Sequence, residues 1–122
     1  MIDRSNWNSY FEDRYREFFI KRDKMARLIQ QRGVYQADIE DALDDPTWVV
    51  RKNTHGDPEL PPGVKLDGDC FDVFCETTEG RVLKIIGRLY ESGQFQVITV
   101  ITNISEADMR YYYREKELIQ DE

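Results

Sequence analysis

The apolar positions follow a helical period at the start of the chain. Between residues 3 and 19, aromatic side chains recur at spacings of three, four, seven and eight, as on one face of a helix: Trp7, Tyr10, Phe11, Tyr15, Phe18 and Phe19. The pattern predicts an N-terminal helical extension over residues 1–20, followed by a single domain over residues 21–122. We expect the aromatic face to pack on the core of that domain. The alternative is that Trp7 and Phe11 contact a partner or a second copy, because six aromatic side chains are many for a terminal helix.

A helical hairpin is predicted next, over "KMARLIQQRGVYQADIEDALDDP" at residues 24–46. The apolar stripes of its two helices are Met25, Leu28 and Ile29, then Ile39, Ala42 and Leu43. Gly33 suits the left-handed position that follows a helix. The second helix is expected to end before Pro46, because the residue that precedes a proline disfavours the helical region.

From residue 47 the period changes to that of strands. Strands are predicted at 47–52, 70–78, 81–90 and 95–103, and the last three are joined by turns short enough for hairpins. A final helix begins at Ser105, in the capping-box-like sequence "SEAD". Helices, then an antiparallel meander of three to four strands, then a helix predict an α+β fold.

The strand at 81–90 indicates which sheet face the helices cover. Leu83, Ile85, Gly87 and Leu89 share one face, which we expect to lie under the helices. The open face then shows Val82, Lys84, Ile86, Arg88 and Tyr90. Two cations and an aromatic ring on an open face suit a phosphate or RNA backbone. The same alternation is also typical of an ordinary solvated sheet face.

The net charge of −7 over 122 residues is unevenly spread. Residues 1–34 have a balance of +3, residues 35–80 of −9 and residues 81–122 of −1. The total argues against non-specific binding of nucleic acid, which relies on Lys and Arg neutralising phosphates, but it leaves room for a local basic groove built from the two ends. No apolar run approaches the roughly 20 residues of a membrane span, and the first residues do not read as a signal peptide, so we expect a cytoplasmic protein without a membrane partner.

Few residues suggest a metal or a cofactor. Cys70 and Cys75 are five apart in a predicted strand, so they point to opposite faces and cannot form a disulfide with each other. The single histidine, His55, lies in an acidic loop over residues 53–69, and one histidine makes a zinc site of the usual kind unexpected. We see no phosphate loop and no dinucleotide fingerprint, so no metal or cofactor is predicted.

The hairpin resembles the one that opens a group of small bacterial domains related to the BrnT toxins. Those domains tend to read Arg-Gly-Ile, a Ser or Thr, Asp-Ile-x-x-Ala-Leu, and Asn-Pro or Asp-Pro before a strand. Here the matching residues are Arg32-Gly33-Val34, Asp38-Ile39, Ala42-Leu43 and Asp45-Pro46. Lys24 stands where the group has a His, and Tyr35 where it has a Ser or Thr. The resemblance covers about residues 21–114. It implies a RelE-like fold, a toxin–antitoxin system with a cognate antitoxin, and endoribonuclease activity.

Cleavage of RNA through its 2′-OH needs a base, a cation for the developing charge and an acid for the leaving oxygen. The candidate catalytic residues are Lys24, Arg88, Arg110 and Tyr112, and the candidate RNA contacts are Arg27, Lys84, Tyr90 and Arg114. Two other hypotheses stay open. The chain is either a non-catalytic module that engages a basic partner through its acidic segment, including Asp44 and Asp45, or a homodimer formed through the aromatic N-terminal helix.

Overall fold

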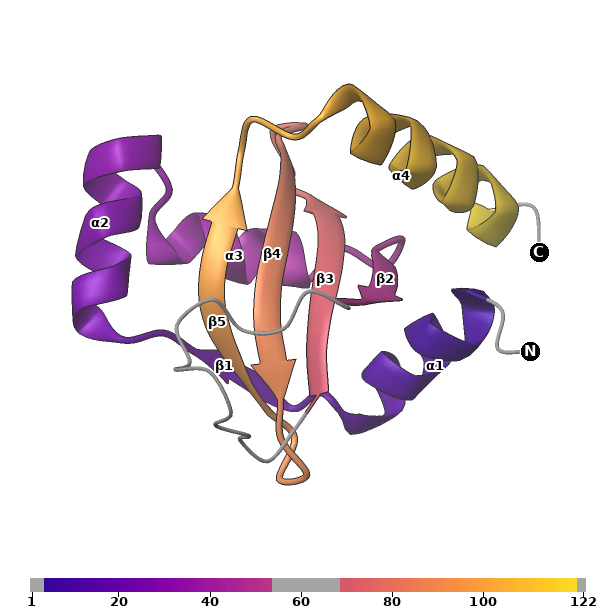
Figure 1. Cartoon of the computed structure of the whole chain (residues 1–122), viewed down its shortest axis with the longest axis horizontal. Helices are drawn as coiled ribbons and strands as arrows, with labels where there is room; N and C mark the ends of the chain where they lie inside the picture. The colour runs from indigo at the N-terminus through magenta and orange to yellow at the C-terminus, as the bar shows by residue number, and fades with distance from the viewer. Residues whose placement is uncertain (1–3, 54–68, 121–122) are drawn as a thin grey trace.

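The computed structural model describes residues 4–53 and 69–120. In chain order its elements are α1 (Arg4–Arg14), β1 (Glu17–Phe19), α2 (Arg22–Arg32), α3 (Gln36–Leu43), β2 (Val49–Lys52), β3 (Asp69–Glu76), β4 (Val82–Leu89), β5 (Gln94–Ile101) and α4 (Glu106–Gln120). The strands form one sheet in the order β1-β5-β4-β3-β2, with β2 to β5 as an antiparallel meander (Figure 1). The predicted α+β class is confirmed.

The helical hairpin is present, and its two helices end at the positions that the sequence predicts. Helix α2 ends at Gly33, whose φ of 62° lies in the left-handed region. The backbone N–H of Gly33 donates to the carbonyl of Ile29, which closes the end of the helix. Helix α3 ends at Leu43, ahead of Pro46. Glycine at the turn and proline after the second helix therefore set both boundaries.

The prediction of one helix up to residue 19 is wrong in its second part. The helix ends at Arg14, and Glu17–Phe19 forms strand β1, which pairs in parallel with β5. Phe18 lies opposite Phe95 in this pairing. A pairing between residues so distant in sequence leaves no periodic signal, and the aromatic residues of a three-residue strand continued the helical spacing by coincidence.

The main core lies between one face of the sheet and helices α1, α2 and α3. Leu83, Ile85 and Leu89 of β4 point into it, as predicted. The aromatic face of α1 also packs here: Phe11 is 0% exposed, and its ring makes edge-to-face contacts with Trp48, Phe71 and Phe95. The expectation that this aromatic face packs on the chain's own core is confirmed.

The opposite sheet face is partly covered by α4. Tyr112 of α4 packs against Val49 and Phe74 in a smaller apolar cluster. Its ring stacks on that of Phe74 with centroids 5.9 Å apart. Helices therefore lie on both faces of the sheet rather than on one, and α4 brings polar residues over strands β2 to β4.

Strand β2 forms one edge of the sheet, and the side chain of Asn8 closes it. The amide nitrogen of Asn8 donates to the carbonyl of Trp48 at 3.0 Å, and its amide oxygen accepts from the N–H of Val50 at 2.7 Å. A primary amide has the same donor and acceptor pair as a peptide unit. The Asn8 side chain thus replaces the hydrogen bonds of a neighbouring strand, so the carbonyl of Trp48 and the N–H of Val50 are both bonded.

Candidate functional site

Four charged side chains from four elements meet on the sheet face that was predicted to be open. Arg51 of β2 donates to Asp72 of β3 at 2.8 Å and to Asp108 of α4 at 3.1 Å. Lys84 of β4 donates to the second oxygen of Asp108 at 2.8 Å. We call these four residues, Arg51, Asp72, Lys84 and Asp108, the charge network. Two cations and two carboxylates give it no net charge.

The local sequence explains how α4 supplies its carboxylate to the charge network. The backbone N–H of Asp108 donates to the hydroxyl of Ser105 at 3.2 Å, so Ser105 caps the helix as predicted. The carboxylate of Asp108 does not complete the capping box. It turns toward the sheet instead, because Arg51 and Lys84 offer it two charged donors.

Burial strengthens the charge network. Asp72 is 3% exposed. The guanidinium of Arg51 lies 5.0 Å from the ring centroids of both Phe74 and Tyr111, within the range of a cation–π interaction. Burial alone would raise the pKa of Asp108, but the hydrogen bonds and positive charges of Lys84 and Arg51 outweigh it and hold the pKa of that carboxyl below its usual value. Asp108 is therefore an anion near neutral pH.

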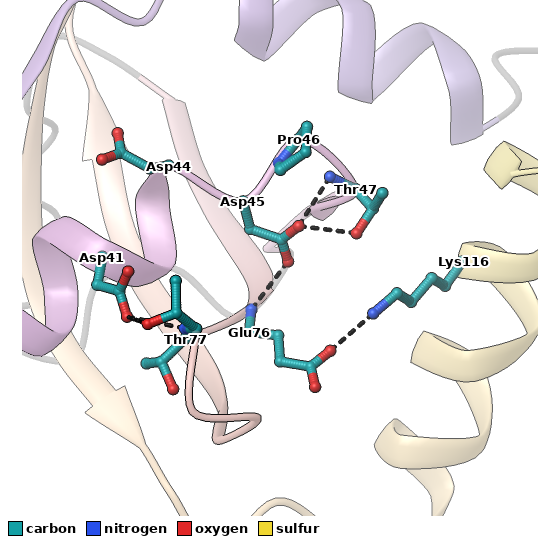
Figure 2. A pocket seen from close by; sticks show the side chains of 9 residues that line it. Asp41, Asp44, Asp45, Pro46, Thr47, Glu76, Thr77 and Lys116 are labelled. Atoms are coloured by element: carbon teal, nitrogen blue, oxygen red, sulfur yellow. Dashed lines mark hydrogen bonds and ion pairs between the residues drawn. The ribbon is translucent and has the colours of Figure 1, made fainter.

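A second polar feature is a pocket of about 270 Å³ at the end of α3. It lies between this end, the start of the β3–β4 turn and helix α4, as Figure 2 shows. Its lining residues are Asp41, Asp44, Asp45, Pro46, Thr47, Glu76, Thr77, Thr78 and Lys116. We call it the acidic pocket, because four of its lining residues are carboxylates and only one is a lysine.

Two of these carboxylates join α3 to the sheet. Asp45 accepts hydrogen bonds from the N–H and the hydroxyl of Thr47, at 2.8 and 2.7 Å, and from the N–H of Glu76 at 2.9 Å. Asp41 accepts from the N–H and the hydroxyl of Thr78, at 2.8 and 3.1 Å. Asp44 is exposed and turns away from these bonds (Figure 2). Asp45, predicted to bind a partner, therefore has a structural role, while Asp44 remains at the surface.

Lys116 links α4 to the same pocket. Its ammonium group donates to Glu76 at 2.8 Å and to the hydroxyl of Tyr112 at 3.1 Å. Burial would lower the pKa of Lys116, but the bonds to Glu76 and Tyr112 outweigh it and raise that pKa. Burial raises the pKa of Tyr112, although Lys116 opposes the change. The charged side chain of Lys116 thus connects α4 to β3.

The structure does not bring the predicted RNA-cleaving residues together. Lys24 and Arg27 lie on α2, which Figure 1 shows on the far side of the sheet from α4. Arg27 pairs with Asp23 along the helix at 3.6 Å. Lys84 belongs to the charge network, and Arg88, four residues further along β4, is only 4% exposed.

The candidates on α4 are divided between the surface and the interior. Arg110 and Arg114 are exposed and pair with Glu106 and Glu115 of the same helix. Tyr112 is 0% exposed, so its hydroxyl reaches Lys116 rather than the surface. The neighbouring Tyr113 is 53% exposed.

The remaining candidates take part in packing. Tyr90 is half-buried and donates to the side-chain oxygen of Gln96 at 2.8 Å. Trp7 is half-buried and packs edge-to-face on Phe71. Cys70 and Cys75 are both buried, and no disulfide joins them. His55 and most of the acidic loop lie outside the described residues.

Sequence reasoning missed Arg51 and Asp72, which complete the charge network. Both are charged residues inside predicted strands, and Asp72 stands between the apolar residues Phe71 and Val73. A carboxylate in such a strand is seldom buried without a partner. That rule could have indicated that Asp72 pairs with a cation on a neighbouring strand, but it does not identify the cation as Arg51.

In the part of the chain that the structure describes, no helix is long and apolar enough to cross a membrane. Across the same residues, no group of three or more His, Cys, Asp or Glu is placed to hold a metal ion. Comparison with protein-family models and with curated proteins gave no match for this chain.

Proposed function

We propose that this protein is a non-catalytic interaction module that binds a basic partner protein, on a scaffold that resembles the RelE-like domains related to BrnT. The observation that carries the proposal is the charge network. It occupies the sheet face where an RNA groove was expected, and it pairs the cations there with carboxylates of the same chain.

A phosphate backbone would have to compete with these carboxylates. Lys84 is held by Asp108 at 2.8 Å, and Arg51 by both Asp72 and Asp108. The side chains of Lys84 and Asp108 are 13% and 21% exposed, so the pair is shielded from much of the solvent that would weaken it. Removing one partner of such a pair leaves the other charge poorly compensated. The site therefore favours its internal partners over an external phosphate.

The charge network also lacks a suitable base. A general base works best when its pKa lies near the operating pH. The pKa of Asp108 moves the other way, to below its ordinary value, which makes this carboxylate a weak proton acceptor. The described residues contain no histidine. This chemistry supports binding rather than cleavage.

The acidic character of the surface around α3 indicates the kind of partner. Five carboxylates and no Lys or Arg lie between residues 38 and 45. Asp44 is exposed at the C-terminal end of α3, where the helix dipole is also negative. Glu79 is exposed in the β3–β4 turn, next to Thr77 and Thr78 of the acidic pocket. These charges complement a basic surface.

Affinity capture with matched variants tests the proposal. The binding variant is Asp44→Asn with Glu79→Gln. The control, Asp13→Asn with Glu91→Gln, removes the same charge from two exposed residues elsewhere. Basic proteins retained by wild type and control, but not by the binding variant, are then purified and titrated with all three forms. We expect the binding variant to have a Kd about 5- to 30-fold higher, because two exposed charge pairs contribute about 1–2 kcal/mol.

Two results would reject this proposed function. One is that every captured protein binds the two variants equally well in titration. The other is that the purified wild-type protein cleaves RNA and that the double variant Arg51→Met, Lys84→Met does not.

A further inference from the structure

Tyr35 exposes an aromatic ring at a position that usually carries a small polar residue. It is the N-cap of α3, where Ser, Thr, Asp or Asn would satisfy a backbone N–H, and its side chain makes no such bond. Tyr35 is 56% exposed, the largest fraction among the exposed large hydrophobic residues that the structure describes. A locally unfavourable choice of this kind is expected where a residue serves another purpose.

An open pocket of about 400 Å³ lies on the same hairpin, between α2 and the first residue of α3. It is lined by Ile20, Arg22, Met25, Ala26, Ile29 and Gln36. Its wall therefore includes the residue that follows Tyr35 in the chain. Ile29 is 38% exposed here, so the pocket offers apolar surface to an incoming side chain. The exposed Tyr35 thus directly precedes a residue of the pocket wall.

The two helices of the hairpin carry opposite charge. Helix α2 has four Lys or Arg and one Asp, a balance of +3, whereas α3 has three Asp or Glu and no Lys or Arg, a balance of −3. Arg22 lines the pocket, and Glu40 accepts a hydrogen bond from Gln36 on the pocket wall. Charges of both signs therefore border the apolar centre.

We propose that two copies of this chain associate through this surface, with Tyr35 of each copy seated in the α2 pocket of the other. In a two-fold dimer the same surface patch is used by both copies, so each contact occurs twice. The ring of each copy then faces the pocket of the other. The same operation places the basic α2 of one copy against the acidic α3 of the other. Specific interfaces usually have an apolar side chain at the centre and complementary charged residues at the rim.

A second copy is the occupant favoured by the charges. This hairpin supplies both of the surfaces that the complementarity requires. The interface differs from the N-terminal aromatic surface considered from the sequence, since Phe11 of that helix is fully buried in its own chain. It also lies at the other end of α3 from the acidic pocket, so it does not rest on the proposed function.

Analytical ultracentrifugation of the full chain over a range of concentrations tests the dimer. The key variant is Tyr35→Ser. Serine is a preferred N-cap, so the variant should be at least as stable as wild type while its dimer dissociates with a Kd at least about tenfold higher. A wild type that stays monomeric at every concentration would overturn the proposal, and so would a dimer that Tyr35→Ser leaves unchanged.

A charge swap tests the orientation. Arg22→Glu and Glu40→Arg should each weaken the dimer by placing like charges together, and the double variant should restore it. Restoration is expected only if α2 of one copy lies against α3 of the other. A double variant that is weaker than either single variant would overturn this arrangement.

Discussion

The side-chain oxygen of Asn8 accepts a hydrogen bond from the backbone N–H of Val50 at 2.7 Å. The bond joins residues 42 positions apart and connects α1 to the edge of the sheet. Together with the bond from the Asn8 amide to the carbonyl of Trp48, it gives β2 the partner that an edge strand lacks. Helix α1 is therefore attached to the sheet by polar contacts as well as by its aromatic face.

Asn8→Ala should destabilise the fold by about 2–4 kcal/mol, because it removes two hydrogen bonds and leaves a backbone donor and acceptor buried without partners. Urea unfolding followed by circular dichroism measures the loss. The exposed neighbour Ser9→Ala is the control and should change stability by less than about 0.5 kcal/mol. Equal stability of the two variants would show that the edge bonds are unimportant.

The pair Lys84 and Asp108 should be strongly coupled. In a double-mutant cycle with Lys84→Met and Asp108→Ala, we expect an interaction free energy of about 1–3 kcal/mol, because the pair is largely shielded from water. The exposed pair Arg110 and Glu106, with side chains 75% and 87% exposed, serves as the comparison. Its coupling should not exceed about 0.5 kcal/mol. Similar couplings for both pairs would contradict a shielded network.

Acid should weaken the fold in part through Asp108. Its folded-state pKa lies below the ordinary 3.8, so its stabilising contribution is present above that pH and is lost as the pH falls further through the folded-state value. Asp108→Asn should therefore be less stable than wild type at neutral pH and lose less stability in acid. Unfolding free energies across this range provide the measurement, and parallel curves for the two proteins would refute the assignment.

Alkali should act in part through Tyr15. Burial, with help from the negative charge of Asp44, raises the pKa of Tyr15 to about 12 from the ordinary 10. The unfolded chain then releases this proton at lower pH than the folded chain, so stability should fall between pH 10 and about 12. Tyr15→Phe should reduce that slope. An unchanged slope in the variant would mean that other groups cause the alkaline loss.

The elements of the fold could largely be predicted from the sequence, because their signals are local. Gly33 and Pro46 mark the ends of the two hairpin helices, and the alternation along β4 separates the face that lies on the main core. Strand β1 could not be predicted in this way. Its three residues become a strand only because β5 offers them a parallel partner, and nothing in "EFF" reports where β5 will lie.

The site was less predictable, because the sequence gives the charge of each residue but not which charged side chains lie close together in the fold. The alternation along β4 correctly predicts Lys84 on the face opposite the main core, but the local sequence "SEAD" does not indicate that Asp108 is its partner. Which carboxylate reaches Lys84 depends on how α4 crosses the sheet. Similarly, Asp44 and Asp45 look equivalent in sequence, while the turn that follows α3 directs only Asp45 into hydrogen bonds with the backbone of the sheet.

The most direct test of the central claim is the affinity of the purified full chain for single-stranded RNA, measured by fluorescence anisotropy at low and moderate salt. Wild type and the double variant Arg51→Met, Lys84→Met are compared. If the cations of the open face are committed to Asp72 and Asp108, the two proteins should show the same negligible affinity. Tight, salt-sensitive binding by wild type that the double variant loses would show that these cations hold phosphate, and it would contradict the account.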